Sequence, residues 1–266
     1  MIPKVAGSRP VDRPSFEGVG LSNWLALLLG LVQGLTEFLP ISSSGHLKLF
    51  QLLFGLDTLE QYILFDLVCH GGTLLAILIV LRRDILNLNR HTLLLLALGT
   101  LPLGLAVLFR RQLETLYGAT SLLGLWFLLT GLILLIGERW RPESSPGKRW
   151  GAVSVGCAQL LALMPGLSRS GATISAGRVL GWERMEAARF AFLLAIPAIA
   201  GGMLVEGMSA AAGALPLSTY LIGFLTSFLV GMLALAALLK LIQRFNLLPF
   251  AWYTLAIGTL TLIYMR

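Results

Sequence analysis

The chain has 266 residues, of which 56% are hydrophobic and only 12% are charged, and its mean hydropathy is +0.83. The charged share is about half of that in an ordinary soluble domain, and several apolar runs reach the roughly 20 residues that a helix needs to cross a bilayer. This composition excludes a soluble globular domain. It predicts an all-α, polytopic membrane protein, because helices satisfy the backbone polar groups of a chain in lipid.

The net charge is +7, from 20 Lys and Arg against 13 Asp and Glu. In a soluble protein this balance would suggest nucleic acid, but here the basic residues lie mostly in short loops between apolar runs. There they orient a membrane protein and contact anionic lipid, so we expect membrane lipid and not nucleic acid as a partner. Cys69 and Cys157 have neither CxxC nor zinc-site spacing, which argues against a disulfide framework or a thiolate metal site.

In chain order, residues 1–23 come first. They contain prolines and charges and lack the apolar core of a signal peptide, so we predict an N-terminal tail before a single membrane domain at 24–265. Within that domain, the regions 24–56 and 150–181 are apolar but broken in the middle by Pro, Gly and Ser, which is typical of re-entrant helical hairpins. Six further apolar runs are long enough to span a bilayer: 62–81, 92–109, 116–136, 187–206, 217–240 and 247–265.

The two broken regions repeat one another. The motif 42-SSSGH-46 recurs as 168-SRSGA-172, at an offset of 126 residues. We therefore predict two repeats, at about 24–136 and 150–265, each with one re-entrant hairpin and three transmembrane helices. Because three is an odd number of spans, the repeats should be inverted. With the basic loops in the cytoplasm, the first hairpin and both termini are expected on the outer side.

The first hairpin carries polar residues that lipid tolerates poorly. Glu37 lies well inside an apolar run, where an uncompensated carboxylate costs several kcal/mol, so it is a functional candidate, with a structural acid as the alternative. Gln33 precedes it by four residues and shares its helix face. An acid and an amide oxygen together can hold a hard divalent cation. Pro40 should end this helix, and we expect the next helix to begin near Gly45–His46.

Three serines follow that break. Ser42, Ser43 and Ser44 offer hydroxyl and backbone N–H groups in front of the next helix, which suits an anion, although helix capping alone would also explain them. His46 can serve as a general acid, base or nucleophile, whereas a lone histidine on an apolar face is more often structural. Asp66 is a second intramembrane acid, and His70 follows it by four residues. These two side chains could simply hydrogen-bond each other.

The second hairpin contains 165-PGLSRSGAT-173. Arg169 is the one cation in a membrane run far from its ends, and a guanidinium pairs well with phosphate oxygens. An Arg169–Glu37 pair without a ligand is the structural alternative. If the two hairpins meet near the midplane, the combined site suits a phosphate group with a divalent cation. Further candidate substrate-binding groups lie close by, namely Ser168, Ser170, Thr173 and the N–H groups after Gly166.

Together, 34-GLTEFLPISSSGH-46 and 164-MPGLSRSGATIS-175 resemble the undecaprenyl-diphosphate phosphatase family of bacterial membranes, which is associated with bacitracin resistance. The segments 65-FDLVCHGGTLLAIL-78 and 190-FAFLLAIPAIAGG-202 are similar to further blocks of that family, and the likeness covers about 24–265. It implies interdigitated inverted repeats with two re-entrant hairpins. It also implies that the terminal phosphate of undecaprenyl diphosphate is removed at a site opening to the periplasmic side of the cytoplasmic membrane.

The resemblance further implies a divalent cation, Mg²⁺ or Ca²⁺. This chain has Gln33 at a position where many relatives have a second Glu, so one carboxylate is missing from the implied cation site, and Asp66 is a candidate to replace it. The family's functional residues fall here on Gln33 and Glu37 for the acidic motif, Ser43 and His46 for the serine and histidine, and Arg169 for the phosphate-binding arginine, flanked by Ser168 and Ser170.

Several alternatives stay open at the level of sequence. The nucleophile could be Ser43, His46 or a water molecule. A transporter or flippase for a polyprenyl phosphate lipid is an alternative function, because inverted repeats with broken helices are typical of transporters. A purely structural membrane scaffold is a third alternative, against which the buried acid, arginine and histidine argue. The sequence also leaves a homodimer open.

Overall fold

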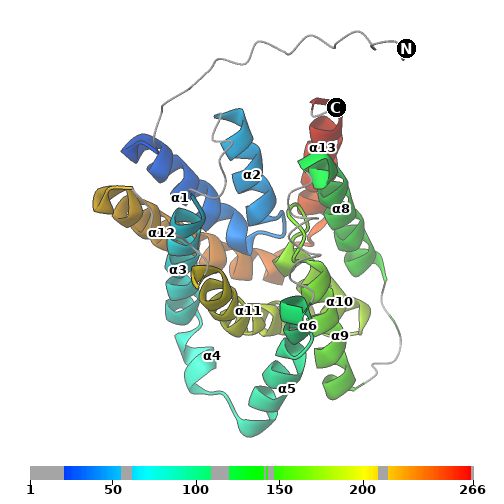
Figure 1. The fold of residues 1–266 in the computed structure, drawn as a ribbon. Helices are drawn as coiled ribbons and strands as arrows, with labels where there is room; N and C mark the ends of the chain where they lie inside the picture. The colour runs from blue at the N-terminus through cyan, green and yellow to red at the C-terminus, as the bar shows by residue number, and fades with distance from the viewer. Residues whose placement is uncertain are drawn as a thin grey trace, which may run out of the picture.

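The computed structural model describes residues 21–54, 62–108, 120–140, 142, 147–208 and 215–264. Within these residues the secondary structure is helical and contains no strands, which confirms the predicted all-α class. Most of the predicted N-terminal tail lies outside the described residues. The helices lie side by side in one bundle, and α1 begins and α13 ends at the same end of it (Figure 1).

The elements follow one another in an order that matches the predicted runs. The first half contains α1 (Asn23–Phe38), α2 (Ser43–Leu53), α3 (Ile63–Val80), α4 (Arg82–Leu86), α5 (Arg90–Thr100), α6 (Leu103–Leu108) and α8 (Leu123–Arg139), which the 3₁₀ turn Thr120–Leu122 precedes. The second half contains α9 (Lys148–Leu161), α10 (Arg169–Val179), α11 (Arg184–Gly207), α12 (Leu217–Arg244) and α13 (Leu248–Tyr264).

The first hairpin consists of α1 and α2. Helix α1 ends at Phe38, just before Pro40, as predicted, because proline disfavours a helical conformation in the residue before it. The prediction that the next helix begins near Gly45–His46 was wrong: α2 begins at Ser43, since the hydroxyl of Ser42 accepts a hydrogen bond from the N–H of Gly45 and caps the helix (3.3 Å). Ser42 adopts φ +72°, which is strained for a residue other than glycine.

The second hairpin, α9 and α10, uses the same local chemistry. The Ser168 hydroxyl accepts a hydrogen bond from the N–H of Gly171 at 3.1 Å and caps α10. Helix α10 has 11 residues, as α2 does, and the two first arms have 14 and 16 residues. At 1.5 Å per residue each arm is shorter than the roughly 30 Å hydrocarbon core of a bilayer.

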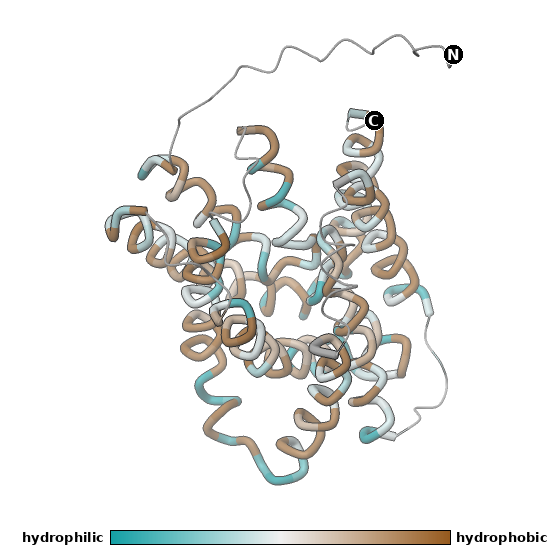
Figure 2. The backbone as a smooth tube through the Cα atoms, in the orientation of Figure 1, coloured by the Kyte–Doolittle hydropathy of each residue, from teal (hydrophilic) through white to brown (hydrophobic). Residues whose placement is uncertain are grey.

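Three of the longer helices have the length and composition to cross a membrane by themselves: α3, α11 and α12. The predicted run at 92–109 is helical but is interrupted at Leu101 and Pro102 and continues as the short helix α6, and its last residue lies outside the described residues. Proline lacks the N–H that the helix would need there. Helices α8 and α13 have 17 residues each and pair with each other. Figure 2 shows apolar residues over most of the bundle, with hydrophilic residues gathered around α4 and the start of α5.

Each hairpin packs against a long apolar segment of the other half of the chain. Helix α1 lies against α12, and α9 lies against α5. Glycines permit both close approaches: a Cβ atom on Gly30 would lie 2.8 Å from the carbonyl oxygen of Gly223, and one on Gly156 would lie 2.2 Å from that of Gly99. Small residues allow helices to approach closely enough for packing without a hydrophobic driving force in lipid. Gly30 and Gly156 are also separated by the 126-residue offset of the repeat.

We expect Gly156→Ala to destabilise the protein, because the added methyl group would overlap the Gly99 carbonyl at 2.2 Å and push α9 away from α5. Overpacking of this kind costs about 1–3 kcal/mol, so the midpoint of thermal unfolding in detergent should fall by several degrees. Gly201→Ala is the matched control, since no atom lies within 4 Å of a Cβ there. Equal melting temperatures for the two variants would contradict this account of the contact.

Candidate functional site

Glu37 is the centre of the site and stands at the last turn of α1. Its side chain is only 3% exposed, and its oxygen Oε2 accepts hydrogen bonds from the Nε2 of Gln33 at 3.1 Å and from the hydroxyl of Ser43 at 2.5 Å. The pairing of Gln33 with Glu37 follows from their spacing of four residues on one helix face. The Ser43 hydroxyl reaches the carboxylate because the turn at 39–42 folds α2 back onto the end of α1.

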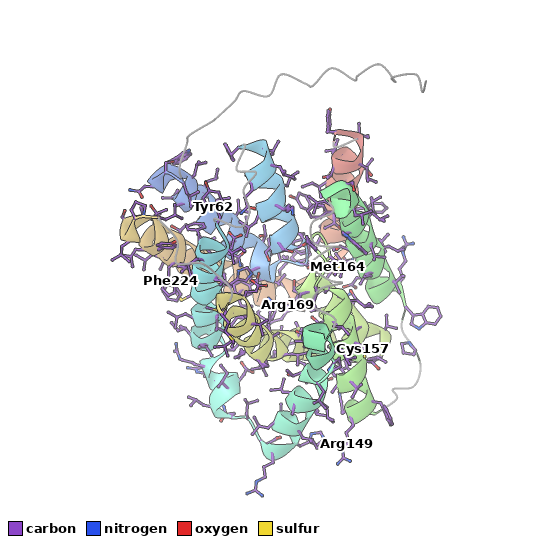
Figure 3. All side chains as sticks on the ribbon, in the orientation of Figure 1. Tyr62, Arg149, Cys157, Met164, Arg169 and Phe224 are labelled. Atoms are coloured by element: carbon purple, nitrogen blue, oxygen red, sulfur yellow. The ribbon has the colours of Figure 1, made fainter. Side chains whose placement is uncertain are left out.

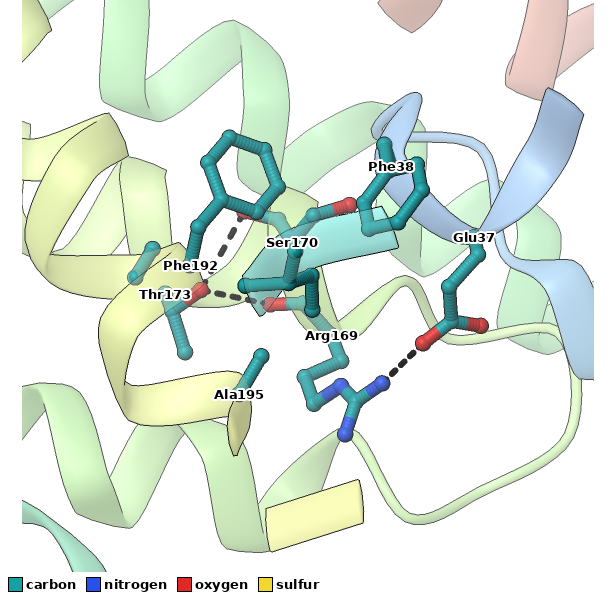
Figure 4. Close-up of a pocket in the computed structure, with 9 residues that line it drawn as sticks. Glu37, Phe38, Arg169, Ser170, Thr173, Phe192 and Ala195 are labelled. Carbon is teal, nitrogen blue, oxygen red and sulfur yellow. Dashed lines mark hydrogen bonds and ion pairs between the residues drawn. The ribbon is translucent and has the colours of Figure 1, made fainter. Parts of the chain in front are cut away.

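Arg169 supplies the opposite charge from the second hairpin. It is the first residue of α10, and its Nη2 forms an ion pair with Oε1 of Glu37 (Figure 4). This pair, across 132 residues, shows that the two hairpins meet, and it is the pair that the sequence offered as the structural alternative to ligand binding. Figure 3 shows Arg169 in the interior of the bundle, whereas Arg149 points away from the lower end. The Arg169 side chain is 25% exposed, so it can also reach a ligand.

The turn before α10 is held by two hydroxyl groups. Thr130 of α8, which is buried, donates to the carbonyl of Gly166 at 2.9 Å and accepts from the N–H of Ser168 at 3.0 Å. Ser42 accepts from the N–H of Gly166 at 3.1 Å, so the two hairpin turns are directly bonded. Gly166 adopts φ +97°, and a Cβ atom on Gly45 would lie 2.7 Å from its Cα. Glycine is needed at 166 for the positive φ and at 45 for the close approach of the two turns.

We expect Thr130→Val to lower the free energy of unfolding by about 1–3 kcal/mol, because the variant keeps the volume but leaves the buried N–H of Ser168 and carbonyl of Gly166 without a partner. The measurement is thermal unfolding of the purified protein in detergent. Thr130→Ser keeps the hydroxyl and is the matched control. A Val variant as stable as the Ser variant would show that the hydroxyl does not hold the turn.

The remaining serines and Thr173 lie around these turns. Ser170 donates to the carbonyl of Leu39 at 3.2 Å and lies 3.2 Å from the hydroxyl of Ser168. The hydroxyls of Ser42 and Ser44 are 3.5 Å apart, and Thr173 donates to the carbonyl of Arg169 at 2.8 Å. Ser42 and Ser168 are therefore both helix caps, which was the structural alternative; their role in binding substrate stays a prediction.

His46 points to the opposite side of the turn, towards α13. Its Nδ1 lies 2.7 Å from the carbonyl oxygen of Ser42 and its Nε2 lies 2.7 Å from the hydroxyl of Tyr253. The ring also stacks on Tyr253 and meets the edge of Phe127. Because a carbonyl only accepts, Nδ1 donates and Nε2 accepts from the tyrosine. Both ring nitrogens are thus engaged, and the catalytic role of His46 stays a prediction.

His70 of α3 approaches the carboxylate instead. Its Nε2 lies 3.9 Å from Oε2 of Glu37, and its Nδ1 lies 2.8 Å from the backbone carbonyl of Asp66. The Asp66 carboxylate turns to Gln51 of α2, whose amide donates to it at 3.3 and 3.5 Å. The Asp66 carboxylate is thus held towards α2, and the hypothesis that it replaces the missing second acid of the motif stays a prediction.

A small pocket opens at the Glu37–Arg169 pair. Its cavity volume is about 10 Å³, roughly the room of one water molecule, so a phosphate group can enter only if the Glu37–Arg169 pair opens. Phe38 and Phe192 form part of its apolar wall (Figure 4), and Ile77 also lines it. The polar residues that line it are Glu37, Arg169, Ser170 and Thr173. A guanidinium, two hydroxyls and a carboxylate bonded to a serine can together bind an anion and activate a nucleophile.

The residues also fit a divalent cation in part. The Oε1 atom of Gln33 is buried and has no hydrogen-bond partner among the described residues, next to the carboxylate of Glu37. A carboxylate and an unpaired amide oxygen are hard ligands that suit such an ion. In the described part of the chain no three His, Cys, Asp or Glu side chains gather into a metal-binding group. The phosphate oxygens of a substrate would have to complete the coordination shell.

Sequence reasoning missed two positions that shape this site and underrated a third. Thr130 and Tyr253 lie in apolar runs of the third and last spans, where a single hydroxyl gives no sign of its distant partner. His70 was a candidate together with Asp66, either in a direct role or as its hydrogen-bond partner. Its spacing of four residues does explain the bond to the Asp66 carbonyl, but its approach to Glu37 depends on how α3 packs beside α1.

Comparison with known proteins identifies the family. The family model described as bacitracin resistance protein BacA matches residues 26–260. The chain is 41% identical over 253 residues to an undecaprenyl-diphosphatase of Protochlamydia amoebophila, a match that covers 91% of the chain and 98% of that relative. It is 40% identical over 257 residues to an undecaprenyl-diphosphatase of Carboxydothermus hydrogenoformans, covering 91% and 97%. The chain therefore belongs to the bacitracin resistance protein BacA family.

Proposed function

We propose that the protein removes the terminal phosphate from undecaprenyl diphosphate, giving undecaprenyl phosphate and inorganic phosphate, and so returns the lipid carrier to cell-wall synthesis. The relatives named undecaprenyl-diphosphatase, 40–41% identical over most of the chain, support this activity. The observation that carries it is the pairing of Glu37 with Arg169 where two short hairpins meet inside an apolar bundle. A lipid diphosphate needs such a polar site within reach of its tail.

The proposed chemistry begins with phosphate binding. Arg169 and the N–H groups at the start of α10 neutralise oxygens of the diphosphate, while the prenyl chain stays in lipid. Arg169 exchanges part of its ion pair with Glu37 for the substrate, which its partial exposure permits. Ser44, Ser168, Ser170 and Thr173 are proposed to add hydroxyl donors around the same group.

Ser43 is the proposed nucleophile. Its hydroxyl donates to Glu37 at 2.5 Å, so the carboxylate is placed to accept the proton as the oxygen attacks the terminal phosphorus and the bond from that phosphorus to undecaprenyl phosphate breaks. Water then attacks the phosphoserine, which releases inorganic phosphate and restores the Ser43 hydroxyl. His46 is bonded to Tyr253 and is proposed to orient the start of α2 through its bond to the Ser42 carbonyl. We propose that, once the bond to Ser42 opens, His46 delivers a proton to the leaving undecaprenyl phosphate. A phosphorylated Ser43 trapped by rapid quench would support the covalent route, and hydrolysis without one would assign the attack to water.

A divalent cation, Mg²⁺ or Ca²⁺, is part of the proposal. Glu37 and the amide oxygen of Gln33 would hold it, together with oxygens of the diphosphate. When bound, such an ion neutralises charge on the two phosphates and orients them. Because Gln33 is neutral, the protein contributes one negative charge to the ion and the substrate must contribute the others.

We further propose that the two halves are inverted repeats with re-entrant hairpins. The packing supports this arrangement: α1 lies on α12 as α9 lies on α5, and α3 lies on α12 as α11 lies on α5. In the proposed repeat α1 corresponds to α9, α3 to α11 and α5 to α12. Each of these helix contacts therefore has an equivalent contact in the other half. The short hairpin arms suit segments that enter and leave on one side. The proposed site then opens to the periplasmic side of the bacterial cytoplasmic membrane, the side on which the first hairpin enters.

The test of the proposed function is phosphate release from undecaprenyl diphosphate by the purified protein in detergent, with and without a chelator. We expect release that stops on chelation and resumes when Mg²⁺ or Ca²⁺ is returned. Hydrolysis needs no second compartment, so this assay separates the phosphatase from a flippase of the same architecture. Binding of the lipid without any release of phosphate would favour the transporter.

A further inference from the structure

Three side chains from three helices converge on one oxygen atom, Oε2 of Glu37. The Ser43 hydroxyl lies 2.5 Å from it, the Gln33 Nε2 lies 3.1 Å from it, and the His70 Nε2 lies 3.9 Å from it. Gln33 and Ser43 belong to the first hairpin, but His70 reaches the same point from α3. A role for His70 at this point is not part of the activity proposed above.

The imidazole of His70 is held in one orientation. Its Nδ1 lies 2.8 Å from the backbone carbonyl oxygen of Asp66, and a carbonyl only accepts, so Nδ1 carries the hydrogen. In the neutral ring the other nitrogen, Nε2, presents its lone pair towards Glu37. Metal-binding histidines commonly donate their second ring nitrogen to a backbone carbonyl in this manner. His46 differs, because Tyr253 occupies its corresponding nitrogen at 2.7 Å.

The distances suit two ligands of one ion. A separation of 3.9 Å between His70 and Glu37 is too long for a hydrogen bond. Two atoms that each lie about 2.0–2.2 Å from one ion are separated by up to about 4.3 Å. The Gln33 amide is 3.1 Å from the same oxygen, and its own oxygen has no partner among the described residues. Since the two ends of an amide exchange by a half-turn of the group, that oxygen can replace the nitrogen beside Glu37.

We infer that His70 is a direct ligand of the divalent cation, which it holds together with Glu37 and the amide oxygen of Gln33. This inference rests on the proposed function only for the presence of a cation. It gives the chain a third protein ligand in place of the carboxylate that Gln33 lacks. An imidazole favours Mn²⁺ and later transition ions over Ca²⁺, so the site should bind Mn²⁺ more tightly than Ca²⁺.

Pulsed electron paramagnetic resonance of the purified protein loaded with Mn²⁺ tests the inference without any turnover. The chain has three histidines, His46, His70 and His91, and labelling only histidine with ¹⁵N makes a nitrogen ligand visible as a coupling to the ion. We expect the coupling in the unaltered protein. It should disappear in His70→Gln, with at least a 10-fold loss of Mn²⁺ affinity, and persist in the matched variant His46→Gln.

A second variant keeps the test decisive if His70→Gln does not fold. In the double variant His46→Gln with His91→Gln, His70 is the one histidine left, so a coupling there assigns the ligand directly. Absence of any ¹⁵N coupling in the Mn²⁺-loaded protein, or its persistence in His70→Gln, would overturn the inference. Phosphate release measured on the unaltered protein loaded with Mn²⁺ reports separately on the proposed function, because a coupling without hydrolysis would refute the activity and leave the ligand in place.

Discussion

Arg169→Ala should lower phosphate release from undecaprenyl diphosphate by at least 100-fold while the protein remains folded. Arg169 is the cation at the Glu37 carboxylate and lines the pocket, so its removal leaves negative charge on the diphosphate without its guanidinium partner. Losing one preorganised charge partner typically costs about 100- to 1,000-fold in turnover. Arg169→Lys should recover only part of the activity, because an ammonium group cannot offer two parallel hydrogen bonds.

A matched control separates this catalytic effect from loss of an ion pair. Arg184 pairs with Glu138 at 2.9 Å, and Glu138, like Glu37, is almost fully buried, with a side chain 4% exposed. That pair lies at another place in the bundle, between α8 and α11. Arg184→Ala should lower thermal stability and leave turnover per folded molecule near that of the unaltered protein. Near-normal turnover of Arg169→Ala would refute the role assigned to Arg169.

Glu37→Gln should also abolish most activity, by a factor of at least 100, and weaken the dependence on divalent cation. The variant keeps the shape of the side chain, but an amide cannot accept the Ser43 proton and is a weaker cation ligand than a carboxylate. It also leaves the Arg169 guanidinium without its partner, so some loss of stability is expected as well.

The measurement for Glu37→Gln is phosphate release across a titration of Mg²⁺ and of Ca²⁺. Glu138→Gln is the control, because it makes the same chemical change at the buried pair with Arg184. The cation midpoint should rise in Glu37→Gln and stay unchanged in the control. If activity falls but the cation midpoint stays unchanged, Glu37 acts as a base for Ser43 and is not a ligand of the cation.

The sequence marked both partners of the main contact of the site as candidates, but gave their pairing only as the structural alternative to ligand binding. Membrane energetics marked Glu37 and Arg169 as charges that need compensation, and the repeated serine motif placed both at corresponding breaks of two hairpins. The ion pair between them is consistent with both facts. The hairpin boundary at Pro40 could likewise be predicted, because the effect of proline on a helix is local.

Contacts that depend on packing could not be predicted in this way. The bond from His46 to Tyr253 spans 207 residues, and that from Thr130 to Gly166 joins an apolar helix to a turn. Neither partner has a pattern in the sequence that points to the other. The positive φ of Ser42 likewise has no sign in the sequence, and its hydroxyl accepts hydrogen bonds from Gly45 and, across the two hairpins, from Gly166.

The central claim is that the two hairpins form one site, and a double-mutant cycle tests it most directly. Phosphate release is measured for the unaltered protein, Glu37→Gln, Arg169→Ala and the double variant, each purified in detergent. Residues that act as a unit lose activity non-additively, so the double variant should be no more than about 10-fold slower than the slower single variant. Losses that multiply, to about 10,000-fold or more, would show two independent contributions and contradict the single composite site.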